Sequence, residues 1–139
     1  MSPGAKSRVQ KCDRDNAQAR LSHARKFLEV AELSATEDQV EETANVSASL
    51  AVLAGIAASD AACCAALGRR ARGQDHREAV GLLEQVKPNG DGAAKALRRL
   101  LDLKDTAHYG LIHVSNQNLK TALRHAEALV TFAASVLRR

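Results

Sequence analysis

The stretch Ser47–Gly68, SASLAVLAGIAASDAACCAALG, would be apolar on nearly every face if it formed a helix. A helix with that pattern is enclosed by other helices rather than lying on a surface. Asp60 stands in the middle of the stretch, and a buried carboxylate must find a partner, take up a proton or reach water. The stretch therefore predicts a long central helix, and Asp60 predicts a polar contact with an element beside it.

The composition indicates one helical domain. The chain has 139 residues, enough for a single core. Hydrophobic residues make up 45% of it and aromatic residues only 2%, so the core must be built from Ala, Leu and Val. Ala and Leu have the highest helix propensities, and only Pro3 and Pro88 interrupt the chain. We therefore expect an all-α protein.

Five segments have the apolar spacing or the boundary signals of helices. We expect these helices at about 13–34, 37–67, from 76 onward, 91–110 and from 115 onward. Thr36 is expected to cap the second helix, Gly55 to kink it and Gly68 to end it. Asp75 with Glu78 resembles a capping box at the start of the third helix. The sequence thus predicts a five-helix bundle around a long central Ala-rich helix.

The N-terminal segment differs from the rest. Residues 1–12 are basic and have no apolar period, so we interpret them as a disordered tail before a helical domain of residues 13–139. The tail also lacks the apolar centre of a signal peptide. Residues 48–67 contain Asp60 and are rich in alanine, which is unlike a membrane span. We expect no contact with a membrane.

The cysteines indicate a reduced protein. There are three of them, and an odd number does not make a disulfide framework. Cys63 and Cys64 are neighbours whose side chains point about 100° apart on a helix, so they do not bridge each other. We interpret the cysteines as small buried apolar residues and expect a cytoplasmic location.

Arginines gather between Gly68 and Arg77, in a chain with a net charge of +4. The candidate ligand-binding residues are Arg69, Arg70, Arg72 and His76. A guanidinium group can bind a phosphate through two hydrogen bonds, which predicts a phosphate-binding patch. The alternative is that these arginines complement a helix dipole and keep the chain soluble. The scarcity of aromatic residues counts against a platform that stacks nucleic-acid bases.

A second candidate site lies near the end of the fourth helix. Lys104 and His108 are four residues apart and share one helix face. A histidine that transfers protons beside a cation that stabilises a charged phosphorane can cleave RNA without a metal. The candidate catalytic residues are Lys104, His108, Tyr109 and Asp60. The alternative is that Lys104 complements the helix dipole and that the His-Tyr pair packs on neighbours. Neither a metal nor a cofactor is expected, since the histidines and cysteines lack paired ligand spacing.

The segment Lys104-Asp105-Thr106-Ala107-His108-Tyr109, together with the long helices and the basic loop leading to Asp75-His76, resembles the HEPN family of small helical bundles over residues 13–138. That family includes metal-independent ribonucleases, among them toxins paired with nucleotidyltransferase-like antitoxins. Many other members are non-catalytic and carry a motif of the type Arg-x-x-Ala-Asp-Tyr. The segment is closer to this second form, with Lys104 for Arg and His108 for Asp. His108 also comes one residue early for the catalytic spacing.

The resemblance implies a non-catalytic module that forms a homodimer and binds a nucleotide, an RNA or a partner protein. One alternative is a metal-independent ribonuclease or toxin with a nucleotidyltransferase-like antitoxin as its partner. The other is a structural bundle that serves only protein association. In such a bundle the central helix lies against the fourth, so we expect Asp60 to contact Lys104, His108, Tyr109 or His76. A contact with His108 would raise the pKa of that histidine.

Overall fold

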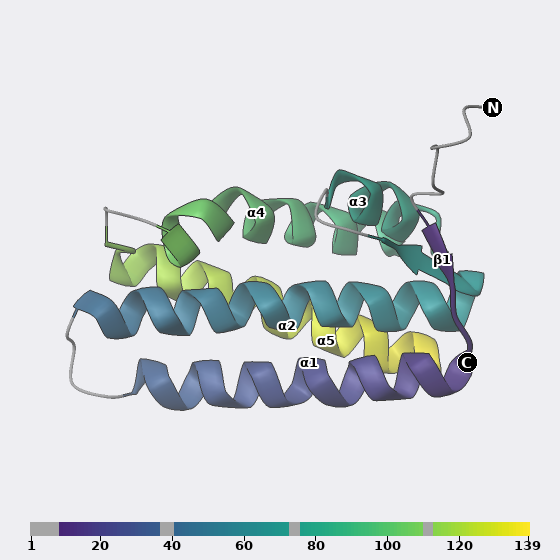
Figure 1. Cartoon of the computed structure of the whole chain (residues 1–139), viewed down its shortest axis with the longest axis horizontal. Coiled ribbons are helices and arrows are strands. Elements are labelled where there is room, and N and C mark those ends of the chain that lie inside the picture. Colours follow the sequence, from purple (N-terminus) through teal and green to yellow (C-terminus); the bar gives the residue numbers. More distant parts are fainter. Residues whose placement is uncertain (1–8, 37–40, 73–75, 110–112) are drawn as a thin grey trace.

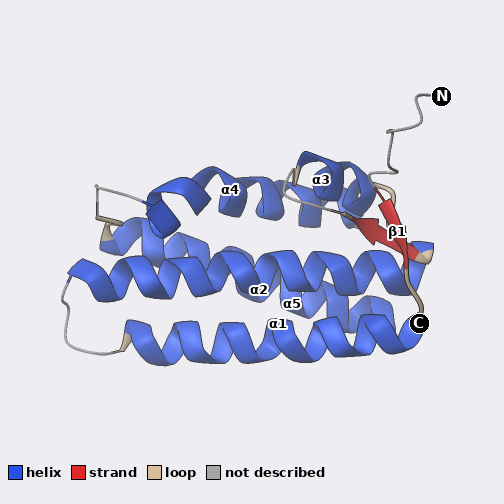
Figure 2. Cartoon of the chain, in the orientation of Figure 1, coloured by secondary structure: helices blue, strands red, loops and turns tan. Residues whose placement is uncertain are grey.

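The computed structural model describes residues 9–36, 41–72, 76–109 and 113–139. In these ranges it contains seven elements: β1 (Val9–Lys11), α1 (Arg14–Ala35), α2 (Glu41–Leu67), β2 (Arg69–Ala71), α3 (Arg77–Glu84), α4 (Gly90–Tyr109) and α5 (Asn116–Leu137). The predicted all-α bundle of five helices is confirmed, and one small two-stranded sheet is added to it (Figure 2).

Helix α2 is the axis of the bundle (Figure 1). Helix α1 runs antiparallel to it on one side, α4 lies on the other side, and α5 crosses behind. The short helix α3 and the sheet lie at the end of the bundle where α1 begins and α2 ends. The predicted central position of the Ala-rich helix is therefore confirmed.

Small side chains let the helices approach α2 closely. The alanines of α2 that are at most 1% exposed are Ala48, Ala51, Ala54, Ala57, Ala58, Ala61 and Ala62. A Cβ atom on Gly55 would lie 2.4 Å from Cδ1 of Leu100 on α4 and 3.2 Å from Cδ1 of Leu129 on α5. Helix α2 runs through Gly55 as one continuous helix, so the predicted kink is wrong. The glycine instead provides room for two neighbouring helices.

Two of the expected helix ends, at Ser115 and Gly68, are confirmed. The Ser115 hydroxyl caps α5 by accepting a hydrogen bond from the backbone N of Asn118 at 3.1 Å. Gly68 follows α2 with a φ of 71°, in the left-handed region that favours glycine. Thr36 was wrongly assigned, because it ends α1 by donating its hydroxyl to the carbonyl of Leu33 at 2.7 Å. The predicted cap Asp75 lies outside the described residues.

The predicted boundary of the disordered tail is also wrong, because residues 9–12 are ordered. Strand β1 pairs antiparallel with β2, which places Val9 opposite Ala71 and Lys11 opposite Arg69. The backbone N of Cys12 then donates to the carbonyl of Gly68 at 3.0 Å. A strand of three residues is too short to show a sequence period, so neither strand could be recognised from the pattern.

Two glycines test how closely α3 and α4 pack. A Cβ atom on Gly90 would lie 2.3 Å from the backbone oxygen of Leu83, whereas one on Gly81 would have nothing within 4 Å. We expect Gly90→Ala to lower the free energy of unfolding by about 1–3 kcal/mol, since a backbone oxygen cannot move away cheaply. Gly81→Ala should raise it by up to about 1 kcal/mol through helix propensity. Urea unfolding followed by circular dichroism measures both, and equal effects of the two variants would contradict this packing.

Candidate functional site

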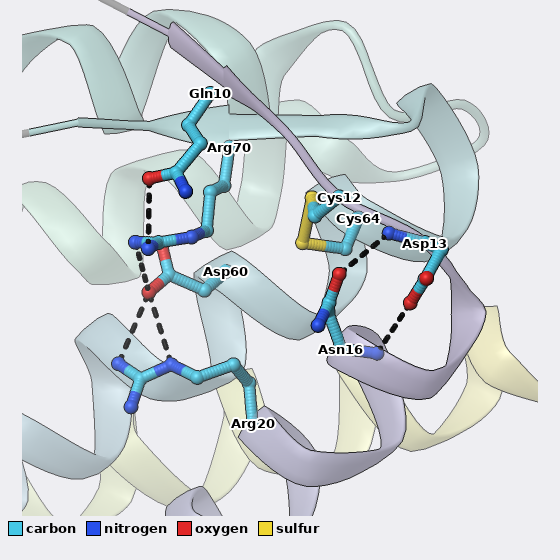
Figure 3. The surroundings of a disulfide bond; sticks show 8 residues. All are labelled: Gln10, Cys12, Asp13, Asn16, Arg20, Asp60, Cys64 and Arg70. Carbon is cyan, nitrogen blue, oxygen red and sulfur yellow. Dashed lines mark hydrogen bonds and ion pairs between the residues drawn. A yellow bond between two sulfur atoms is a disulfide. The ribbon is translucent and has the colours of Figure 1, made fainter.

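Asp60 is buried, with 6% of its surface exposed, and it binds two arginines from different parts of the chain (Figure 3). Its Oδ2 accepts from Nε of Arg20 at 3.1 Å and lies 3.0 Å from a terminal nitrogen of the same guanidinium. A terminal nitrogen of Arg70 lies 3.7 Å from the same oxygen. Asp60 on α2 therefore holds one cation from α1 and one from β2.

The two arginines compensate the burial of this carboxyl group. Burial raises the pKa of Asp60 above its ordinary value, while the charges of Arg20 and Arg70, the hydrogen bond from Arg20 and the charge of His76 act in the opposite direction. Arg70 is itself oriented by a hydrogen bond from its other terminal nitrogen to Oε1 of Gln10 at 3.1 Å. The side chains of Arg20 and Arg70 remain 29% and 33% exposed, so both also face solvent.

A cavity of about 370 Å³ lies next to this cluster. The residues that line it are Gln10, Lys11, Cys12, Asn16, Ala19, Arg20 and Arg70. We call it the arginine pocket. Its walls come from β1, from the first turns of α1 and from β2, so three separate segments of sequence build it. Lys11, Arg20 and Arg70 bring three cations to the lining, and the nearby carboxylates of Asp60 and Asp13 offset only part of this charge, so we expect a positive potential in the pocket.

The sequence-predicted arginines separate onto different faces. In a strand, neighbouring side chains point to opposite sides, so Arg70 faces the pocket and Arg69 does not. Arg69 donates to Oε1 of Gln85 at 3.0 Å instead. Arg72 is exposed, and His76, just before α3, is close enough to affect the pKa of Asp60. Of the predicted ligand-binding residues, only Arg70 lines the pocket.

Sequence reasoning missed Gln10, Lys11 and Arg20. The first two fall in the predicted disordered tail, and Arg20 falls in the predicted helix at 13–34, where the sequence analysis gives it no role. One signal was available for Arg20. Arg20 and Asp60 are equally far from residue 40 in sequence, and an antiparallel helix pair connected near that residue brings them side by side.

The second candidate site lies at the opposite end of α2. Nδ1 of His108 on α4 lies 2.8 Å from Oγ of Ser49, within hydrogen-bond distance. Burial lowers the pKa of His108, and the charge of Lys104 lowers it further, while Asp105 raises it. Lys104 is half-buried on the same helix face. The structure therefore brings His108 and Lys104 together; it does not describe the side chain of Tyr109.

Asparagine joins the elements at this end of the bundle. The side-chain amide of Asn45 on α2 donates to the carbonyl of Thr106 at 3.3 Å, and its oxygen accepts from the backbone N of Val114 at 2.8 Å. One side chain thus links α2, the last turns of α4 and the segment before α5. This contact holds His108 next to the beginning of α2.

The predicted contact between Asp60 and the end of α4 is wrong. Ser49, the partner of His108, precedes Asp60 by eleven residues on one continuous helix. This spacing is about 16 Å. Asp60 binds Arg20 and Arg70 instead, and of the predicted neighbours whose side chains the structure describes, His76 is the one that acts on its pKa. Without a contact to Asp60 the condition for a raised pKa of His108 is not met, and burial and the charge of Lys104 lower that pKa.

Two of the three cysteines form a disulfide, so their interpretation as unpaired apolar residues is corrected. Cys12, directly after β1, is bonded to Cys64 in the last turn of α2, with their Cα atoms 5.3 Å apart (Figure 3). The sequence separation is 52 residues, which no local pattern could reveal. Cys63 is free and buried, and burial followed by the charge of Asp60 raises its pKa to about 12.

Helix α2 is long and apolar enough between Glu42 and Leu67 to cross a membrane by length and composition alone. However, 67% of its most apolar window is buried inside the bundle, as in the core helix of a folded domain. Within the described residues no group of three or more His, Cys, Asp or Glu side chains is arranged to hold a metal ion.

Comparisons with known proteins do not assign the chain to a family. No protein-family model matches the sequence, and no curated protein matches it. The resemblance to the HEPN family therefore stays a prediction, and the function has to be argued from the arginine pocket and from the end of α4.

The histidines should make stability depend on pH. The folded-state pKa values of His108 and His125 are both lowered, the latter by burial and by Arg99 and Arg124. Below the ordinary pKa of histidine the unfolded chain binds more protons than the folded chain, so stability should fall as the pH falls below about 6.5.

His108→Gln and His125→Gln should each reduce this dependence between pH 7.5 and 5.5. Urea midpoints at the two pH values measure the effect. His23→Gln is the matched control, because His23 is exposed on α1. The lowered pKa values would be contradicted if the urea midpoint of the wild type rose between pH 7.5 and pH 5.5 by more than the midpoints of the two variants.

Proposed function

We propose that the chain is a non-catalytic, HEPN-like helical module that binds a phosphate-bearing ligand, a nucleotide or an RNA, in the arginine pocket. The observation that carries the proposal is the Asp60 cluster. A single buried carboxylate holds Arg20 and Arg70 at 3.0 and 3.7 Å. Lys11 lines the same cavity, and within the part of the chain that the structure describes it forms no ion pair with Asp60.

The chemistry of the pocket suits an anion. A guanidinium group carries five N–H donors in a planar fork, and Asp60 and Gln10 engage only part of those of Arg70. The fixed guanidinium groups lose little side-chain freedom when a phosphate arrives, which favours binding. The volume of about 370 Å³ lies in the range of small-molecule sites.

The pocket favours binding over catalysis. Its lining residues include amides, cations and a disulfide-bonded cysteine, but no histidine or carboxylate that could transfer a proton near neutral pH. His108, which the sequence predicts as a general base, lies far from the pocket. It contacts Ser49 near the other end of α2. A phosphate in the pocket would therefore meet positive charge without an acid–base partner from that helix.

Binding is tested with a short fluorescein-labelled oligouridylate and, separately, with ATP as competitor. Arg70→Gln and Lys11→Gln should each weaken binding about tenfold, because each removes one charged contact. The matched control is Arg98→Gln, which removes the same charge from an exposed arginine paired with Glu84 at 3.3 Å. Equal losses in all three variants would mean that only net charge matters, and the pocket would not be the site.

The two probes separate the two ligand classes. Competition by ATP in the micromolar range would identify a nucleotide site. Binding of the oligouridylate without competition by ATP would identify RNA. Its affinity should then fall with rising salt concentration, because the release of counterions from the RNA gains less free energy at high salt. Failure of the wild-type chain to bind either probe would overturn the proposed function.

A metal-independent ribonuclease is the second candidate, favoured by the contact between His108 and Ser49. A neutral imidazole, as the lowered pKa of His108 indicates, can accept a proton from a ribose hydroxyl, and Lys104 could stabilise the phosphorane. Structured RNA incubated with the chain and EDTA should then be cleaved, and His108→Ala should abolish cleavage. Equal cleavage by the variant would assign any activity to a contaminant.

A homodimer and an antitoxin partner remain predictions. Light scattering measures whether the chain is a homodimer.

A further inference from the structure

We propose that the Cys12–Cys64 disulfide is a redox clasp that controls the arginine pocket, so that the oxidised chain binds its phosphate-bearing ligand and the reduced chain binds it weakly. This inference rests on the proposed function for its ligand. Its structural part, the release of β1 on reduction, can be tested without any ligand.

The disulfide lies in the wall of the pocket. Cys12 is one of the lining residues, directly after Gln10 and Lys11 in sequence. Its partner Cys64 is four residues after Asp60 and so lies one turn further along α2, on the same face. Figure 3 shows the bond beside the Asp60 cluster. One covalent bond thus ties the strand that carries Gln10 and Lys11 to the helix that carries Asp60.

Few other contacts hold that strand. β1 and β2 have three residues each, and an isolated two-stranded ladder is marginal in water. Gln10 and Lys11 are exposed, while Val9 is half-buried and packs with Cys12 against the core. Within the described residues, the hydrogen bonds beyond the ladder include the backbone bond from Cys12 to Gly68 and the bond from Arg70 to Gln10. Without the disulfide this strand should separate from β2 far more often than α1 separates from α2.

Separation of β1 would damage the pocket but not the bundle. It removes the cation Lys11 and releases Arg70 from its partner Gln10. Arg20 stays at Asp60, because α1 packs along α2 through buried residues such as Ala17, Leu21 and Ala24. Reduction should therefore weaken ligand binding while the helices persist.

The surroundings of the bond suit reversible exchange with a dithiol. A thiolate of the dithiol attacks Sγ of Cys12, because Cys12 is less buried than Cys64. The S–S bond then breaks, and Cys64 leaves as a thiolate that takes up a proton. The second thiol then attacks the mixed disulfide, which oxidises the dithiol and releases Cys12. The dithiol supplies two electrons and two protons. Nearby cations favour the departing Cys12 thiolate.

The third cysteine does not interfere. Cys63 is buried and its pKa is raised to about 12, so it carries almost no thiolate at neutral pH. Reshuffling between neighbouring sulfurs is therefore suppressed, and the clasp has two states. Cys63→Ser is accordingly a suitable control that keeps the disulfide.

The experiment compares oxidised and dithiothreitol-reduced wild-type chain with the labelled oligouridylate and ATP, with mass spectrometry after alkylation to count free thiols. We expect one free thiol before reduction and about tenfold weaker binding after it. Cys12→Ser should bind the probes with the affinity of the reduced wild type, and dithiothreitol should not change that affinity. Cys63→Ser should bind like the wild type before and after reduction. Unchanged affinity on reduction, with binding still lost in Arg70→Gln, would overturn the clasp and keep the proposed function.

Hydrogen exchange tests the clasp even if neither probe binds. The amides of β1 and β2 that pair in the ladder should lose protection on reduction, while those in the middle of α1 and α2 keep theirs. Retained protection of the ladder would overturn the clasp. Loss of helical circular dichroism on reduction would also overturn it, since the disulfide would then hold the whole fold rather than one strand.

Discussion

The burial of Asp60 in an alanine-rich helix is the constraint on which the arrangement depends. An unpaired carboxylate there would be costly, so α1 and β2 must each bring an arginine to it. The buried side chains of α1, Leu21 among them, and the pair of Arg20 with Asp60 therefore favour the same register of α1 on α2. Because both arginines are part-exposed, the pairs contribute more to position than to stability.

Sequence periodicity predicted the outer helices because each of them buries a stripe of side chains spaced at three or four residues, and the central helix was predicted from its continuous apolar run. Ser115 and Gly68 marked their helix ends through local hydrogen bonding and backbone conformation, which depend on few neighbours. Thr36 has the same capping chemistry at either side of a connection, and it was assigned to the wrong helix. The short strands and the disulfide depend on residues far apart in sequence, so no local pattern predicted them.

The candidate site could be predicted only in part for a similar reason. Arg70 was recognised by its type, but its strand neighbours point elsewhere, which only the pairing of β2 reveals. The expected contact between Asp60 and His108 is wrong because α4 runs antiparallel to α2. The chain leaves the end of α2, passes through α3 and returns along α4, so the last turn of α4 reaches the beginning of α2 (Figure 1). The two candidate sites therefore lie about three helical turns apart, on one face of α2.

The disulfide has a global and a local effect, and the two differ in kind. Closing a loop across 52 residues stabilises a chain by about 4 kcal/mol in the entropic account, through the unfolded state. A domain with ordinary stability, about 5–15 kcal/mol, can lose that amount and stay folded. Cys12 precedes the cap of α1 directly, so the packed helix keeps it near Cys64 even when the bond is open. What reduction frees is the strand before it, which holds the pocket's Lys11 and Gln10.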